Sequence, residues 1–228
     1  MGYSNTSKGR GVKGSKYWIQ TVVEEEELRR ALESELGEAL EWLSPLAGEE
    51  NTYDEYELRD GYVCERLGLS WADAESFFSF WPKRQPQWDA IALGGEGTVL
   101  YLFEAKAHVT ELESKCAATN VYSKELIIKS MNEVKEKYFA RGDFEAWLNK
   151  YYQLGNRLTF LRKLGEKPFG KISAVKLVLL NFVNDNTYIP TPKEEWEGHY
   201  KSVLAEMTGG ESAPEDVIII NYDVGNLK

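Results

Sequence analysis

Two almost uninterrupted apolar segments limit what this chain can fold into. They are "KISAVKLVLLNFVND" at 171–185 and "DVIIINYDV" at 216–224. Both are rich in β-branched residues, which favour strands. A strand that is apolar on both faces must be covered on both faces. Helical patterns lie before and between these segments, so we predict a three-layer α/β/α domain with a central mixed sheet.

The other predicted elements follow from hydrophobic spacing and from turn residues. A stripe of apolar residues predicts one long N-terminal helix, and two apolar runs around "GGEG" predict a hairpin. The full set is a helix at 17–42 (Leu28, Leu32, Leu36, Ala39 and Leu43 forming its stripe), a strand within 52–60, one or two short helices at 61–81, hairpin strands at 88–93 and 98–106, and helices at 123–140, 143–164 and 191–208.

The length of 228 residues suits one domain with a short extension. Residues 1–16 are basic and rich in glycine and serine, which predicts a flexible tail before a single domain at 17–228. No apolar segment follows this tail as in a secretory signal, and none is long enough to span a membrane. Cys64 and Cys116 are predicted to be free thiols in a reducing cytoplasm. With two cysteines and two histidines in the chain, a zinc site is not expected.

The charge distribution is uneven along the chain. The net charge of −10 argues against a general nucleic-acid coat protein. Residues 17–75 hold four basic and seventeen acidic residues, a net of −13, whereas residues 115–176 hold thirteen basic and six acidic residues, a net of +7. The basic middle segment could contact phosphates, although a solvated lysine-rich helix face explains it more simply.

Three charged residues interrupt the predicted hairpin, "PQWDAIALGGEGTVLYLFEAKAH" at 86–108. Alternation along a strand places Glu104 and Lys106 on one face. If the "GGEG" loop has an even length, Leu93 faces Thr98 and Asp89 lies diagonal to Glu104 on that same face. A loop of odd length would put the two acids on opposite faces.

Buried charges need a partner or a metal ion. Two carboxylates are the oxygen ligands that Mg²⁺ accepts together with water and substrate phosphate. Lys106 could hold a metal-bound water or stabilise charge on a phosphate. The simpler alternative is a cross-strand salt bridge among Asp89, Glu104 and Lys106.

These residues resemble the PD-(D/E)XK nuclease superfamily, which has the restriction-endonuclease-like fold. Asp89 matches the acid at the start of the second core strand, and Glu104-Ala105-Lys106 matches the acid-x-lysine motif of the third. The resemblance covers roughly residues 20–184 and implies an αβββαβ core. It also implies that Asp89 and Glu104 hold Mg²⁺ or Mn²⁺ and that Lys106 positions or activates the attacking water. The chain departs from the motif because Gln87 and Trp88 separate Pro86 from Asp89.

Members of this superfamily often carry another acid on the first core helix. Glu35 lies on the apolar stripe and is the candidate for this additional metal ligand, and Glu55 in the next predicted strand is its rival. "YYQLGNR" resembles the glutamine-containing helix of some members, which makes Gln153 a candidate site residue. Arg157 is a candidate for substrate binding because guanidinium pairs with phosphate.

The resemblance implies a metal-dependent nuclease that hydrolyses phosphodiester bonds, with DNA the expected substrate. A second hypothesis is a catalytically inactive nuclease fold that serves as a nucleic-acid- or protein-binding module, because fold alone does not give function. A third, an acidic enzyme of unrelated chemistry, requires that the carboxylates of Asp89 and Glu104 do not converge.

Overall fold

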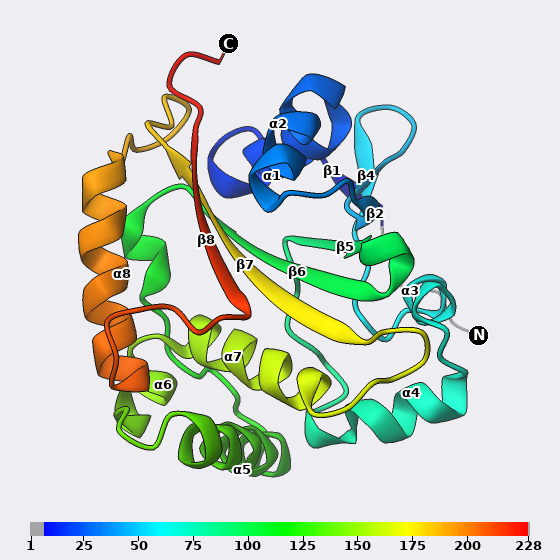
Figure 1. The fold of residues 1–228 in the computed structure, drawn as a ribbon, viewed down its shortest axis with the longest axis vertical. Coiled ribbons are helices and arrows are strands. Elements are labelled where there is room, and N and C mark those ends of the chain that lie inside the picture. The colour runs from blue at the N-terminus through cyan, green and yellow to red at the C-terminus, as the bar shows by residue number, and fades with distance from the viewer. Residues whose placement is uncertain (1–6, 228) are drawn as a thin grey trace.

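The computed structural model describes residues 7–227 and is built around one five-stranded sheet (Figure 1). The strand order is β2-β5-β6-β7-β8. The pairs β2–β5 and β5–β6 are antiparallel, whereas β6–β7 and β7–β8 are parallel. The sheet is therefore mixed, and the predicted α/β class is confirmed. The strands are β2 (Glu41–Ser44), β5 (Ala90–Gly94), β6 (Val99–Lys106), β7 (Ala174–Val183) and β8 (Val217–Asp223).

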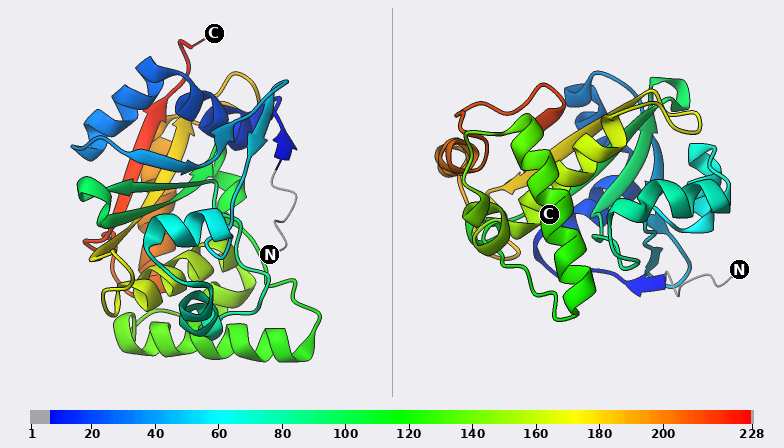
Figure 2. Two further views of the ribbon diagram at one scale, coloured as in Figure 1. Left: turned by 90° about the vertical axis from the view of Figure 1, so that its right-hand side faces the viewer. Right: turned by 90° about the horizontal axis from the view of Figure 1, so that it is seen from below.

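Helices cover both faces of this sheet (Figures 1 and 2). One face packs against α1 and α2, and the other packs against α5, α6, α7 and α8. The helices are α1 (Gly14–Glu24), α2 (Glu26–Leu36), α3 (Gly61–Leu67), α4 (Trp71–Phe77), α5 (Val121–Tyr138), α6 (Phe144–Asn149), α7 (Tyr152–Gly165) and α8 (Lys193–Thr208), with short 3-10 turns η1 (Phe78–Phe80), η2 (Gly95–Gly97) and η3 (Val109–Leu112).

The pleat of β6 divides the core into two apolar clusters. Tyr101 and Phe103 belong to the cluster that contains residues of α1 and α2. Leu100 and Leu102 belong to the cluster that contains residues of α5, α7 and α8. Since side chains alternate along a strand, the even-numbered positions of β6 face α5–α8. The charged residues at the end of β6 are even-numbered, so they reach that side as well.

The hairpin loop between β5 and β6 decides how the charged residues meet. Gly94 pairs with Val99, which leaves a loop of four residues, 95–98. Gly95 and Gly97 have φ values of +56° and +87°, a conformation that glycine adopts without steric cost. The loop is even, the condition under which Asp89 and Glu104 share a face, but the register is shifted by two residues. Ala90 pairs with Phe103 as the last pair of the ladder, and the N–H of Asp89 donates to the carbonyl of Phe103 at 3.1 Å, so Asp89 lies beside Phe103 and Glu104 rather than opposite Leu102.

The prediction of a single long helix at 17–42 is wrong. The chain forms α1 and α2, with extended backbone at Glu25 between them. Gly37 then adopts a left-handed conformation that ends α2, as glycine commonly does after a helix. The residues beyond it form β2, which pairs with β5 and buries Trp42 and Leu43. The apolar stripe that predicted one helix therefore includes residues of α2 and also residues of β2, the first strand of the central sheet.

The strand predicted within 52–60 is shorter than expected and lies outside the central sheet. It forms β4 (Thr52–Asp54), between β1 (Ser7–Gly9) and β3 (Leu46–Ala47) in a separate three-stranded sheet. Residues 1–6 of the predicted tail lie outside the described residues. Residues 7–16 include β1 and the start of α1, and Arg10 donates to Glu24 at 2.7 Å.

The helix predicted at 143–164 is divided into α6 and α7. The backbone of Ser114 inserts at the break: its N–H donates to Lys150 O at 2.7 Å, and its carbonyl accepts the N–H of Tyr152 at 3.1 Å. These bonds replace the helical partners at this point. As a result α7 begins at Tyr152, and Gln153 and Arg157 lie in its first two turns.

The other predicted elements differ from the structure by a few residues at their ends. Residues 123–140 correspond to α5, 191–208 to α8, 171–185 to β7 and 216–224 to β8. Cys64 and Cys116 are free thiols, as predicted. Within residues 7–227, none of the helices has the length and apolar character that crossing a membrane requires.

Candidate active site

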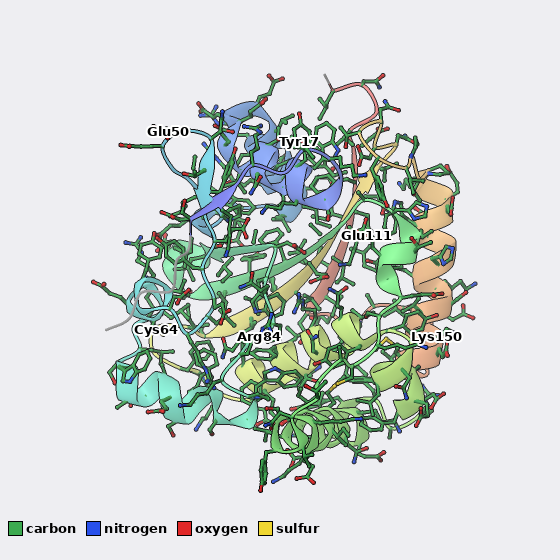
Figure 3. All side chains as sticks on the ribbon, turned by 180° about the vertical axis from the view of Figure 1, so that it is seen from behind. Tyr17, Glu50, Cys64, Arg84, Glu111 and Lys150 are labelled. Carbon is green, nitrogen blue, oxygen red and sulfur yellow. The ribbon has the colours of Figure 1, made fainter. Side chains whose placement is uncertain are left out.

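Asp89, Glu104 and Lys106 meet on the side of the sheet that faces α5–α8. Glu104 and Lys106 end β6, and Asp89 stands just before β5. The ammonium of Lys106 lies 2.5 Å from Glu104 Oε1, and the two side chains are only 9% and 5% exposed. In Figure 3, Glu111 marks the end of β6, where its carboxylate accepts the N–H of Ala107 at 3.1 Å. The structure therefore brings together the three residues that the sequence singled out.

Helix α7 contributes two further side chains to this cluster. Lys106 Nζ donates to Gln153 Oε1 at 3.1 Å. Arg157 Nε donates to Glu104 Oε2 at 2.5 Å. Gln153 and Arg157 are four residues apart, so they lie on one face of the helix, one turn from each other. Each of them thereby holds one of the charged residues of β6.

Arg157 is placed differently from the predicted phosphate-binding residue. It is 3% exposed, and its remaining nitrogens donate to Asn156 Oδ1 at 2.9 Å and to the carbonyl of Gln87 at 2.5 Å. Its guanidinium also lies 4.4 Å from the centre of the Trp88 ring, within the range of a cation–π contact. Three of its five N–H groups are engaged in these bonds, so Arg157 positions Glu104. Binding of a phosphate by its two other N–H groups stays a prediction.

The pKa values of the two carboxyl groups are shifted in opposite directions. Burial, with the nearby charge of Glu104, raises the pKa of Asp89 to about 7. Burial also acts to raise the pKa of Glu104, but Arg157 and Lys106 outweigh it and hold that pKa below its usual range. Burial would lower the pKa of Lys106, yet Glu104 and Asp89 together raise it. Near neutral pH the cluster therefore holds a charged lysine, a charged Glu104 and an Asp89 that readily takes up a proton.

One oxygen of each carboxylate has no hydrogen-bond partner among the described residues, which makes the pair a candidate metal site. Asp89 Oδ2 accepts the N–H of Ala105 at 2.8 Å, while Oδ1 has no hydrogen-bond partner among residues 7–227. Glu104 Oε1 faces Lys106 without the geometry of a hydrogen bond. Across the described part of the chain, no three His, Cys, Asp or Glu side chains gather as metal ligands. Two carboxylates fit Mg²⁺, which uses one or two of them and fills its remaining positions with water and phosphate.

Neither candidate for an additional acid joins this pair. Glu35 is exposed on α2, the helix that covers the opposite face of the sheet. Its place on the stripe was misleading because α2 buries only Leu32 fully. Glu55 lies near α1, where its carboxylate is 3.3 Å from Lys16 Nζ and accepts from Gln20 at 3.1 Å. Glu55 is therefore occupied by other partners.

Three polar residues beside the cluster were missed in the sequence. Asn181 pairs in register with Lys106 and is fully buried. It accepts from the hydroxyl of Tyr200 at 3.0 Å and donates to Asn221 at 2.9 Å. Burial, and then the charge of Glu104, raises the pKa of Tyr200 and keeps its hydroxyl protonated. The available signals were Asn181 and Asn221, polar residues inside the apolar runs of β7 and β8.

Comparison with protein family models, curated proteins and solved structures finds no match to this chain. The geometry and the charges of the cluster are therefore the basis for a functional proposal.

Proposed function

We propose that this protein is a metal-dependent phosphodiesterase that hydrolyses nucleic acid, with DNA as the expected substrate. One observation carries the proposal: Asp89, just before β5, lies beside Glu104 and Lys106 of β6, where its carboxylate accepts the N–H of Ala105 at 2.8 Å and the charges of both residues shift its pKa. The order of helix, β2, β5, β6, helices and β7 agrees with the αβββαβ core of the PD-(D/E)XK superfamily. This agreement supports a restriction-endonuclease-like fold.

The carboxylates of Asp89 and Glu104 would hold Mg²⁺ or Mn²⁺. A bound divalent ion supplies charge neutralisation at the phosphate and a water of lowered pKa. Binding requires that Asp89 lose its proton and that Lys106 move from Glu104 Oε1. Both changes are accessible near neutral pH, because the pKa of Asp89 is about 7 and Lys106 has a second partner in Gln153.

Lys106 would act as a hydrogen-bond donor. Glu104 and Asp89 raise its pKa, so at neutral pH it holds its proton and is unsuited to accept one from water. Its ammonium can instead orient the attacking water or stabilise the negative charge that develops on the phosphate. Gln153 fixes the direction of that ammonium, and Arg157 fixes Glu104.

A catalytically inactive binding module is the second candidate. One observation favours it: Glu104 already pairs with two cations, Lys106 at 2.5 Å and Arg157 at 2.5 Å. A carboxylate neutralised twice is stable without a metal ion. The inactive module differs from the enzyme in one measurable respect, because it gains no hydrolysis and no stability from divalent cations.

A cleavage assay tests the proposal. Single- and double-stranded DNA and RNA are incubated with Mg²⁺ or Mn²⁺ and with the wild type, Asp89→Asn or Lys106→Met. Glu35→Gln is the matched control, since it removes one carboxylate from the opposite side of the sheet. Cleavage by the wild type and by Glu35→Gln, lost in the other two variants, supports the enzyme. Absence of metal-dependent cleavage of every substrate favours the binding module.

A further inference from the structure

We propose that an open cleft beside the carboxylate pair binds one unpaired nucleobase of the substrate strand. This inference rests on the proposed function and adds to it the part of the substrate that is recognised. The cleft has a volume of about 510 Å³. Its walls are the 81–86 segment before β5, the segment 117–123 that leads into α5, and the first two turns of α7.

Gln85 is the residue that points to a ligand. It is 4% exposed and lines the cleft. Neither its amide nitrogen nor its amide oxygen has a hydrogen-bond partner in the structure. Buried polar groups nearly always have such partners. A ligand that offers an acceptor beside a donor would satisfy both atoms at once, and the edge of a nucleobase has this pattern.

The other lining residues fit a flat and uncharged ligand. Trp81, Ile127 and Tyr152 supply apolar surface. Among the described residues that line the cleft, Arg84 alone is charged, and it is exposed at the rim. Figure 3 labels Arg84, which lies near α7 in that view. A cation at the rim of a neutral cleft suits a base whose phosphate stays outside.

The cleft shares a wall with the carboxylate site. Tyr152 and Asn156 line the cleft, and Gln153 and Arg157 follow them directly on α7. Tyr152 and Asn156 are four residues apart, and so are Gln153 and Arg157. The two pairs therefore form adjacent rows on the helix surface. Asn156 also accepts from Arg157 at 2.9 Å. A base in the cleft would therefore belong to a nucleotide near the phosphate held at Asp89 and Glu104.

An exposed aromatic residue lies next to the cleft. Tyr122 is 82% exposed, between Asn120 and Ser123, which both line the cleft. Exposed aromatic rings stack on the bases of single strands without regard to sequence. A base inside a duplex cannot enter such a cleft without leaving its stack. The inferred substrate is thus a single strand or a duplex region with an unpaired base.

Binding of mononucleotides tests this inference separately from cleavage. The four deoxynucleoside monophosphates are titrated into the wild type, Gln85→Leu and the control Gln87→Leu, with tryptophan fluorescence as the readout. Deoxyribose 5-phosphate shows whether phosphate alone is bound. Gln87 is a suitable control because it is exposed and its amide donates to Glu57 at 3.1 Å. We expect at least one nucleotide to bind the wild type and Gln87→Leu about tenfold more tightly than Gln85→Leu.

The thermal melt separates a ligand-binding Gln85 from a structural one. Leucine has a similar volume and no unpaired polar atoms, so Gln85→Leu should melt roughly 2–4 °C higher than the wild type. A lower melting temperature, or nucleotide binding equal in Gln85→Leu and wild type, overturns the inference. Binding of deoxyribose 5-phosphate as tight as that of the nucleotides also overturns it.

The combined results tell the two proposals apart. If the wild type cleaves DNA and Gln85→Leu binds nucleotides equally well, the cleft inference fails and the phosphodiesterase stands. If no substrate is cleaved but nucleotide binding depends on Gln85, the cleft inference stands and the phosphodiesterase fails. If neither cleavage nor nucleotide binding is observed, both fail.

Discussion

Replacing Asp89 by asparagine should stabilise the metal-free protein at alkaline pH. In the folded protein the pKa of Asp89 is about 7, well above its ordinary value of 3.8. A raised carboxyl pKa means that the folded state binds the proton more tightly than the unfolded state does. The stability due to this proton is complete below pH 3.8 and is lost as the pH rises to 7. Asparagine keeps the neutral form at every pH and can still accept the N–H of Ala105.

The size of the effect follows from the same pKa. Each pKa unit corresponds to about 1.36 kcal/mol, so the advantage of Asp89→Asn should grow by at most about 3 kcal/mol between pH 5 and pH 8. Asp89 is partly exposed, which reduces the expected growth to roughly 1–3 kcal/mol. Above pH 7 the difference between the two proteins should level off.

Urea unfolding at pH 5, 6, 7 and 8, with EDTA present, measures this difference. Tryptophan fluorescence gives the free energy of unfolding of the wild type and of the variant at each pH. Glu35→Gln controls for the loss of one negative charge. A difference in unfolding free energy that does not change with pH, or one that shifts in favour of the wild type from pH 5 to pH 8, would refute a partly buried Asp89 held next to Glu104.

Further predictions concern the metal ion and the two cations. Mg²⁺ at a hundred times its dissociation constant should stabilise the wild type by about 2.7 kcal/mol and should leave Asp89→Asn unchanged in a thermal melt; equal shifts would contradict binding at Asp89. Lys106→Met should slow cleavage by at least about a hundredfold while calorimetry still detects Mn²⁺ binding; cleavage at the wild-type rate would exclude a role in the reaction. Arg157→Ala should lower the free energy of unfolding by about 3–5 kcal/mol because it removes one of the two buried cations that pair with Glu104. Lys163→Ala, which removes the more exposed ion pair between Lys163 of α7 and Glu133 of α5, should cost under about 1 kcal/mol; equal losses in the two variants would contradict a buried pair at Arg157.

Strands and helices with a clear hydrophobic pattern could be predicted from the sequence. The points at which one element ends and the next begins could not. β7 and β8 are nearly continuous apolar runs rich in β-branched residues, and this pattern favours a strand over a helix. The N-terminal helix failed because Trp42 and Leu43 continue a helical spacing while they belong to β2. That strand forms by pairing with β5, fifty residues away, and helical spacing within a window does not contain this information. The break before α7 likewise depends on Ser114, which is distant in sequence.

In the candidate site, too, the features set by nearby residues were predictable, and those set by contacts distant in the sequence were not. Alternation along β6 and the even loop placed Asp89, Glu104 and Lys106 on one face, although the register differs by two residues. The role of Arg157 could not be read from its helix, since its partners come from β6 and from the 81–88 segment. Gln85 lies between Arg84 and Pro86 in a loop with no periodicity, so its burial was invisible in the sequence.

Anomalous scattering from a crystal soaked in Mn²⁺ tests the central claim most directly. The claim is that the carboxylates of Asp89 and Glu104 together hold a divalent ion. It predicts one Mn²⁺ peak within ligand distance of both carboxylates, with Lys106 moved away from Glu104 Oε1 and Arg157 still bound to Oε2. A crystal without a peak between the two carboxylates, in which Lys106 stays paired with Glu104, would contradict it.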